Sequence, residues 1–340
     1  MFPSLIIPTR NKCLFLARTL ASLSRQSEMR FEVVVVDDGS DDDTRDVARR
    51  FASDLDLRYI RRAHKGRAAA RNAAIHAARG DLLIFCDDDR LAARDFVRDH
   101  AAAHGAGSPP LVALGRQRGI LTLWSRDWNL AATAVADAIA ARPIIATQLA
   151  QARAELVSID DIRERLDEVI SLHGLDEPWW VSHVLPILEA FGPDMAGFAF
   201  PWTTGVTGNL SVPRAIAEQV GLFDESFVGW GLEDTDFHFR LHSAGVHTRI
   251  LDGALNHHQL HARPAEQVLE WARNAIRMLE KYDSLELCLY LRIVRRRLSI
   301  LEANRIALEY AAAGDSMRAT VAELVRLNKE HFRILAQATL

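Results

Sequence analysis

The sequence predicts an α/β fold in which helices flank a mostly parallel, twisted sheet, with a helical insertion and a helical C-terminal extension. Short apolar, β-branched runs alternate with helical patterns over the first third of the chain. This alternation is typical of a parallel sheet covered on both faces. Polar clusters follow three of the runs, and ligands of such sheets bind beyond the carboxyl ends of the strands. We therefore expect one binding edge.

The first four strands are expected at residues 4–9 (SLIIPT), 31–38 (FEVVVVDD), 57–62 (LRYIRR) and 81–86 (DLLIFC). Leucines near helical spacing predict a helix within residues 11–26. Acidic residues that suit a helix N-terminus open a second helix within residues 41–52, and the alanine-rich residues 67–78 form a third. The fourth strand is almost continuously apolar, as in strands buried on both faces.

The pattern changes after about residue 120, where residues up to about 195 read as a helical insertion interrupted at Pro143. Small residues and short apolar runs return at 197–212, a helix with an acidic start follows at Glu233, and residues 246–258 read as another strand. We therefore expect a first domain over residues 1–262, in which the insertion separates a first half (1–116) from a second half (197–262). Residues 263–340 form a helical C-terminal segment.

The composition is that of an ordinary globular protein, with 49% hydrophobic and 25% charged residues and a formal net charge of -4. No basic face stands out, so nucleic acid is not an expected partner. Three widely spaced cysteines, Cys13, Cys86 and Cys288, favour reduced thiols and a cytoplasmic location. Residues 289–301 mix apolar residues with arginines, and we interpret them as a packed helix with a basic face; peripheral membrane contact through the C-terminal helices is the alternative. The sequence does not specify an oligomeric state.

The buried strand at 81–86 ends on three consecutive aspartates, Asp87, Asp88 and Asp89. Hard divalent cations prefer carboxylate oxygens, and a bound Mn²⁺ or Mg²⁺ would offset the repulsion among these charges. Such an ion also neutralises a departing diphosphate. The alternative is a solvated turn in which Asp88 or Asp89 caps a helix that begins near Ala93.

Two further motifs lie at the same predicted edge. Asp37 and Asp38 end a strand beside Gly39, where a carboxylate can accept the imide N–H of a uracil ring. Gly66 opens a loop, and Arg71 on the following helix could contact a base or phosphate. Each has a plain alternative, which is an ordinary turn for the aspartates and a solvated arginine on an alanine-rich helix.

Four segments together resemble family 2 glycosyltransferases of the GT-A (Rossmann-like) fold. They are IIPTRN, VVVVDDGSDDDT, GRAAARNAAIHAARGDLLIFCDDDR and GLFDESFVGWGLEDTDFHFRLHSAG. The resemblance covers about residues 3–116 and 200–262, and GWGLEDTD is similar to the acceptor and catalytic motif of inverting, galactosyltransferase-like members. It implies a nucleotide-diphosphate sugar donor, with UDP favoured, and a carbohydrate or glycoconjugate acceptor. It also implies that residues 1–116 are the nucleotide-binding half of the first domain and residues 197–262 its acceptor and catalytic half.

The resemblance also implies roles for matching positions. Asp234 is implied as the general base, with Glu233 beside it as an acceptor-binding carboxylate. Asp87 is expected nearer the ribose and Asp89 nearer the metal, with His258 and then His257 as further metal ligands. The nucleotide-binding set is Pro8, Thr9, Arg10, Asp37, Asp38, Gly66, Arg71, Asp87 and Asp88, and the acceptor-binding set is Trp230, Gly231, Glu233, Gly208 and Asn209.

The chemistry agrees with these roles, because an inverting transfer needs a base that deprotonates the acceptor hydroxyl as it attacks. Neighbouring carboxylates can tune such a base. The plain alternatives are a helix-dipole role for the acidic residues at 233–236, a core position for Trp230, a packed strand at 208–209, and surface or core positions for the histidines.

Two other functions fit the same pattern of residues. A nucleotidyltransferase also uses paired aspartates, but it usually has a glycine-rich and basic phosphate loop after the first strand, where this chain has PTRNKCLF. A non-catalytic sugar- or partner-binding module is the second, and the intact acidic set disfavours it. The motifs of serine hydrolases, zinc proteases, P-loop enzymes and dinucleotide-binding dehydrogenases do not occur in the sequence.

Overall fold

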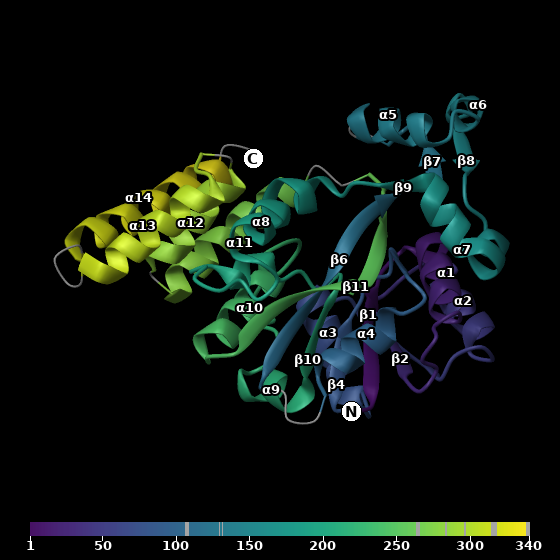
Figure 1. Cartoon of the computed structure of the whole chain (residues 1–340), viewed down its shortest axis with the longest axis horizontal. Coiled ribbons are helices and arrows are strands. Elements are labelled where there is room, and N and C mark those ends of the chain that lie inside the picture. The colour runs from purple at the N-terminus through teal and green to yellow at the C-terminus, as the bar shows by residue number, and fades with distance from the viewer. Residues whose placement is uncertain are drawn as a thin grey trace.

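The protein is built around a nine-stranded mixed sheet (Figure 1). The computed structural model describes residues 1–105, 109–128, 130, 132–262, 266–282, 284–295, 297–313 and 318–337. The strand order is β3-β2-β1-β4-β10-β6-β11-β5, and β9 also pairs with β6. The strands are β1 (Pro3–Thr9), β2 (Glu32–Asp37), β3 (Leu57–Arg61), β4 (Leu82–Phe85), β5 (Arg90–Ala92), β6 (Leu111–Ile120), β9 (Gly174–Leu175), β10 (Leu210–Pro213) and β11 (His247–Gln259).

The four expected N-terminal strands are present and parallel, which confirms the α/β prediction for this part of the sheet. β11 runs parallel to β6, whereas β10 lies antiparallel between β4 and β6, and β5 is antiparallel to β11. The sequence reading did not identify β5 or β6. β5 ends at Ala92. The helix that was expected to begin near Ala93 is α4 (Phe96–Ala103), which begins three residues after Ala93.

Alternate side chains of the strands pack into two hydrophobic cores on opposite faces of the sheet. Leu5 and Ile7 of β1 pack with α1 (Cys13–Leu23), α2 (Thr44–Phe51), α4 and α7 (Ile159–His173). Ile6 points to the other face and packs with α3 (Arg67–Ala77), α9 (Arg214–Gln219) and α10 (Glu233–Ser243). Full burial of a large aliphatic side chain stabilises the fold by about 1.5–3 kcal/mol, so both faces of these strands contribute.

The segment between β6 and β10 is mostly helical but includes short strands. It contains β7 (Leu123–Ser125), α5 (Ala132–Ala141), α6 (Ile145–Leu149), β8 (Arg153–Glu155), α7, a π-helical turn (Trp180–Val184), α8 (Leu185–Phe191) and a 3₁₀ turn (Pro201–Thr204). β7 and β8 form a separate antiparallel pair. α7 begins with a capping box in which Ser158 and Asp161 satisfy each other's backbone N–H groups.

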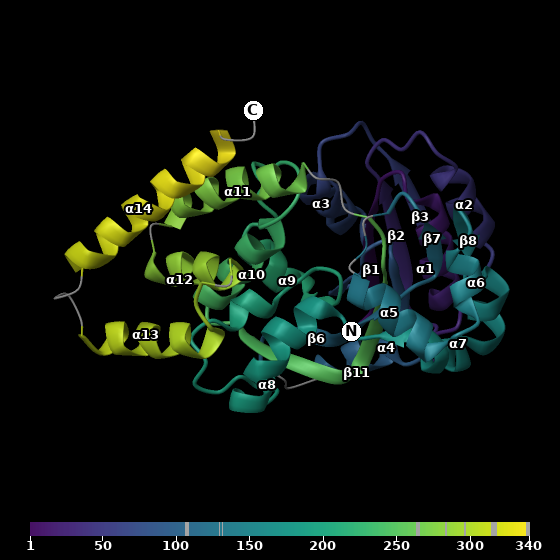
Figure 2. The same ribbon diagram turned by 90° about the horizontal axis from the view of Figure 1, so that it is seen from above.

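The C-terminal helices α11 (Gln267–Tyr282), α12 (Leu285–Val294), α13 (Ile300–Ala313) and α14 (Arg318–Gln337) form a group beside α10, far from α1 and α2 (Figure 2). The predicted helical C-terminal segment is thus confirmed. Leu289 and Leu291 are buried in the core, and Arg295 lies 5.8 Å from the centre of the Phe332 ring. Arg296 and Pro264 lie outside the described residues. Among the helices that the structure describes, none is long and apolar enough to cross a bilayer.

Candidate active site

A cavity of about 1610 Å³ lies at the carboxyl ends of β1 and β4. It extends from the loops of the N-terminal half to α12 and α13. The expected residues that line it are Pro8, Thr9, Arg10, Asp38, Gly66, Arg71, Asp87, Asp88, Asp89, Trp230, Gly231, Glu233, Asp234 and His258. Four expected residues do not line it, namely Asp37, Gly208, Asn209 and His257. The three acidic and polar clusters of the sequence therefore do meet at one edge of the sheet.

Asp38 organises the loop before α3. Its carboxylate accepts hydrogen bonds from the backbone N–H of Gly66 at 2.7 Å and of Lys65 at 3.0 Å, and it contacts His64 Nδ1 at 2.7 Å. Gly66 has a φ of 98°, which favours glycine. Asp38 therefore shapes the cavity wall while lining it.

Asp37 turns away from the cavity. It accepts a hydrogen bond from Ser40 N at 2.7 Å and another from the Tyr59 hydroxyl at 2.5 Å. Both oxygens are engaged and the residue is 1% exposed. The plain alternative, a turn-forming carboxylate, describes this position better than a nucleotide contact.

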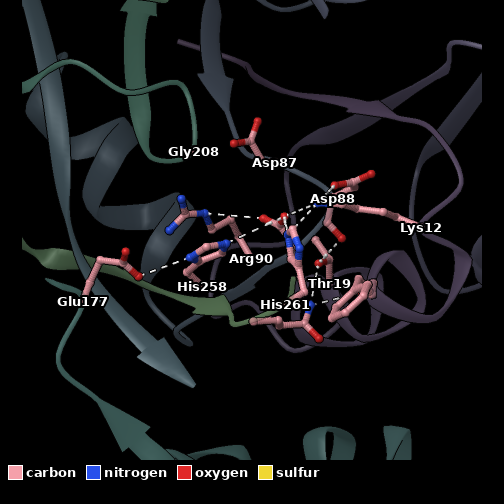
Figure 3. Close-up of polar contacts among 12 residues, drawn as sticks. Lys12, Thr19, Asp87, Asp88, Arg90, Glu177, Gly208, His258 and His261 are labelled. Atoms are coloured by element: carbon pink, nitrogen blue, oxygen red, sulfur yellow. Dashed lines mark hydrogen bonds and ion pairs between the residues drawn. The ribbon is translucent and has the colours of Figure 1, made fainter. Parts of the chain in front are cut away.

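Asp89 lies at the centre of a charged cluster. Figure 3 shows three of its neighbours, Lys12, His258 and His261. Its Oδ2 accepts a hydrogen bond from Lys12 Nζ and lies 3.0 Å from His261 Nε2 and 3.9 Å from His258 Nε2. Lys12 Nζ is also 2.9 Å from His261 Nε2. Burial opposes ionisation, but the charge of Lys12 and the hydrogen bond with His261 hold the pKa of Asp89 well below its usual value. This aspartate is therefore anionic at neutral pH.

Three of these residues could hold a metal ion. Ligand atoms of Asp89, His258 and His261 all lie within 4.8 Å of one another. Burial, and then the charge of Arg90, lowers the pKa of His258, so the ring is neutral, as a metal ligand must be. Its Nδ1 is 3.2 Å from Glu177 Oε2, and such a second contact orients a ligating imidazole. In this mixed set the carboxylate suits manganese, whereas the imidazoles are less specific for that ion.

The neighbouring histidine, His257, lies apart from this group. Consecutive side chains of a strand point to opposite faces, so His257 is buried on the far side of β11 while His258 lines the cavity. His261 joins the group instead, from just beyond the end of β11. The sequence analysis assigned no role to His261, although its spacing of three from His258 was an available signal.

Arg71 connects the donor edge to the start of α10. Its guanidinium donates to Asp87 Oδ1 at 3.1 Å and to Glu233 Oε1 at 2.9 Å, and it packs 5.5 Å from the centre of the Phe223 ring. Arg71 is 2% exposed. It lines the cavity, as expected for a nucleotide-binding residue, but its terminal nitrogens hold the two carboxylates in place.

Asp234 is half-buried at the first turn of α10 and faces the cavity. Burial, followed by the nearby charge of Glu233, raises the pKa of Asp234 to about 7. A carboxylate poised near neutral pH is suited to general base catalysis. Asp236 has a different role, because it is fully buried and binds Lys281 Nζ at 2.8 Å and Arg240 Nε at 2.9 Å. The helix-stabilising alternative thus describes Asp236.

The loop before α10 is anchored by α11. Trp230 N donates to Glu270 Oε2 at 2.9 Å, and Asn274 Nδ2 donates to the carbonyl oxygens of Val228 at 3.1 Å and Gly231 at 2.9 Å. Gly231 has a φ of 95°, and a Cβ there would lie 2.7 Å from the Trp271 ring. Only glycine fits both the backbone and the space, so the C-terminal helices fix the loop that presents Glu233 and Asp234.

Gly208 and Asn209 have structural contacts beside the sheet. Asn209 is fully buried, accepts from His100 Nε2 at 2.8 Å, and donates to the carbonyl oxygens of Arg116 at 3.0 Å and Ala254 at 2.9 Å. Gly208 allows close approach of Arg90, whose side chain would lie 2.8 Å from an added Cβ. These contacts favour the packed-strand alternative for both residues.

Comparisons with known proteins agree with this geometry. The model named Glycosyl transferase family 2 matches residues 4–153, and the model named N-terminal domain of galactosyltransferase matches residues 192–262. The uncharacterized glycosyltransferase YfnE of Bacillus subtilis (strain 168) is 33% identical over 294 residues, which cover 84% of this chain and 71% of that protein. The chain belongs to the family 2 glycosyltransferases. As a glycosyltransferase it uses a nucleotide-sugar donor, which decides against the nucleotidyltransferase and the non-catalytic module.

Other relatives and structures extend the comparison. Validoxylamine A glucosyltransferase of Streptomyces hygroscopicus subsp. jinggangensis (strain 5008) is 33% identical over 287 residues, which cover 83% of this chain and 61% of that protein. The S. aureus TarS 1-349 structure in complex with UDP-GlcNAc has a TM-score of 0.54 at 16% identity, over 87% of this chain and 72% of that one. At this identity the likeness shows the fold, which confirms the GT-A prediction.

Proposed function

We propose that this family 2 glycosyltransferase is dication-dependent and inverting, that it takes a UDP-sugar as donor, and that Asp234 is its general base. The observation that carries the proposal is the position of Asp234. This half-buried carboxylate, with a pKa raised to about 7, shares one cavity with the aspartates that follow β4. The proposal treats residues 1–262 as the transferase domain and 263–340 as a supporting segment.

The donor side of the cavity is assigned to the nucleotide. Pro8, Thr9, Asp38 and Gly66 line this end. The TarS structure cited above contains UDP-GlcNAc, which supports UDP as the nucleotide to test first. Asp87, held by Arg71, is assigned to the ribose.

The residues proposed to hold the cation are Asp89, His258 and His261. Their donor atoms, one carboxylate oxygen and two imidazole nitrogens, favour Mn²⁺ over Mg²⁺, because Mg²⁺ prefers oxygen ligands. A bound ion would supply charge neutralisation for the departing diphosphate. The contact of Lys12 with Asp89 and His261 places a second positive charge in this region, where it can also meet diphosphate oxygens.

The acceptor hydroxyl is assigned to Asp234. In the proposed displacement, the hydroxyl oxygen forms a bond to the anomeric carbon while the bond from that carbon to the diphosphate oxygen breaks, and the hydroxyl proton passes to Asp234. Attack from the face opposite the diphosphate inverts the anomeric centre. Glu233, fixed by Arg71, is assigned to acceptor binding, and its second oxygen, Oε2, has no hydrogen-bond partner among the residues that the structure describes.

The first test is a thermal-shift screen of UDP, GDP and dTDP with and without Mn²⁺, because a ligand that binds the native state raises its stability. We expect UDP with Mn²⁺ to give the largest shift. The UDP-sugar that then supports transfer is used to compare Asp234→Asn with wild type. The variant should lose at least ~10²-fold in kcat, the lower range for loss of a general base, and should keep its UDP affinity.

Asp252→Asn is the matched control, since Asp252 is an exposed aspartate that does not line the cavity. It should retain wild-type turnover. Near-normal turnover of Asp234→Asn would remove Asp234 as the base. Full activity after exhaustive chelation, with metal content verified, would remove the assigned role of the cation.

A further inference from the structure

One end of the active-site cavity has an apolar wall. The wall consists of Val228, Trp271, Ile293, Val294, Leu298 and Leu301, which come from the loop before α10 and from α11, α12, α13 and the segment between the last two. Val228 is 62% exposed, Val294 43% and Leu301 47%. Large apolar side chains left open together beside catalytic groups mark a binding surface rather than scattered surface residues.

The wall is continuous with the catalytic carboxylates. It lines the same cavity as Glu233 and Asp234, and the Tyr290 hydroxyl on α12 lies 3.5 Å from Thr235 Oγ1, next to the base. Pockets for one small ligand usually have about 300–1,000 Å³, whereas this cavity has about 1610 Å³. It therefore has room for a donor and for a second ligand beyond Asp234.

The chemistry of the wall disfavours a further sugar ring. Aliphatic side chains offer no partner to sugar hydroxyls, and a polar group buried without a hydrogen bond costs free energy. Two carboxylates beside the wall are already engaged, because Glu270 accepts from Trp230 N at 2.9 Å and Glu302 accepts from Ser299 Oγ at 2.6 Å. Gln267 and Arg297 also line this part of the cavity, so polar partners border the wall but do not form it. An apolar group has no hydroxyl that burial against the wall would leave without a hydrogen bond, so it does not incur this free-energy cost.

We infer that this wall binds an apolar aglycone, an alkyl or aryl group carried by the acceptor whose hydroxyl Asp234 deprotonates. The inference rests on the proposed function and specifies its acceptor class. It distinguishes this chain from a transferase that binds only sugar units at the acceptor side. The aglycone lies against Val294 and Leu301 while its hydroxyl-bearing part reaches Asp234.

The test compares methyl and n-hexyl β-glucoside below the micelle concentration of the latter, in the presence of UDP and Mn²⁺. Binding is followed by quenching of tryptophan fluorescence, since Trp230 and Trp271 line the cavity. Each fully buried methylene gives about a fourfold gain in affinity. We expect the hexyl compound to bind at least about tenfold tighter than the methyl compound.

Two variants on α13 localise the effect. Leu301→Asp places a charge on the wall and should abolish the gain from the hexyl chain. Leu308→Asp is the matched control, because Leu308 is equally exposed at 50% on the same helix but does not line the cavity. It should retain the full gain. Both variants should bind UDP as wild type does.

The outcomes separate the two proposals. Failure to bind UDP would contradict the proposed function, whereas normal UDP binding with equal affinity for methyl and hexyl glucoside would overturn the aglycone site alone. Equal losses in the two leucine variants would also overturn it. If the protein sediments as a dimer that Leu301→Asp converts to a monomer, a second copy covers the wall and the inference is wrong.

Discussion

Replacing Arg71 with methionine should destabilise the protein and disturb its active site. Methionine keeps the alkyl contact with Phe223 but removes the guanidinium that bonds Asp87 and Glu233. The Asp87 side chain is 27% exposed and can be hydrated, but that of Glu233 is 5% exposed and would be left as an uncompensated buried charge. Breaking such a buried pair costs about 3–5 kcal/mol of unfolding free energy.

The loss of unfolding free energy is measured in thermal and urea unfolding experiments that are monitored by tryptophan fluorescence. Arg71→Met and Glu233→Gln are combined in a double-mutant cycle. The double variant should recover part of the loss, because the neutral amide no longer needs a cation. Arg305→Met is the control, since Arg305 pairs with Glu309 at 2.6 Å on the surface, where such pairs contribute about 0–1 kcal/mol. A loss for Arg71→Met no larger than for Arg305→Met would refute the reasoning.

Three further outcomes are expected. The kcat/KM for transfer should fall about tenfold per pH unit below pH 7, because Asp234, with a pKa of about 7, loses its basic form as pH falls; a flat profile between about pH 5 and pH 8 contradicts this assignment. Lys12→Met should raise Mn²⁺ affinity at least about tenfold in calorimetry, because the Lys12 ammonium competes with the ion for Asp89 and His261. An unchanged affinity would show that the ammonium does not compete for the metal site. Asn274→Leu should lower kcat by roughly 10–100-fold at unchanged UDP affinity, because it releases the loop that presents Asp234; equal losses of both would indicate general unfolding.

The N-terminal half of the fold could be predicted because local pattern and tertiary environment agree there. Strands such as Glu32–Asp37 are buried on both faces and read as unbroken apolar runs. The strand Leu111–Ile120 was missed because its polar second half, GRQRGI, breaks the apolar pattern. Those polar residues are accommodated by side-chain contacts made elsewhere in the chain, such as that between Gln117 and Arg90 at 3.2 Å.

The candidate site was predicted where a motif places a side chain directly at a strand end or helix start, as for Asp89 and Asp234. The site could not be predicted where a role depends on which face of a strand a side chain points to. The choice between His257 and His258 depends on which face of β11 meets the cavity, and the sequence alone leaves that face open. The contribution of α11 to the loop before α10 was also hidden, because Glu270 and Asn274 are about 40 residues away from their partners.

The contact between Lys12 and His261 joins positions separated by 249 residues. A ribosome adding about 5–20 residues per second delivers the histidine roughly 12–50 s after the lysine. During that interval the acidic edge of the nascent sheet has Lys12 as a counterion but lacks both imidazoles. The lysine can thus neutralise Asp89 while synthesis continues, and the complete cluster forms only after the last strand has emerged.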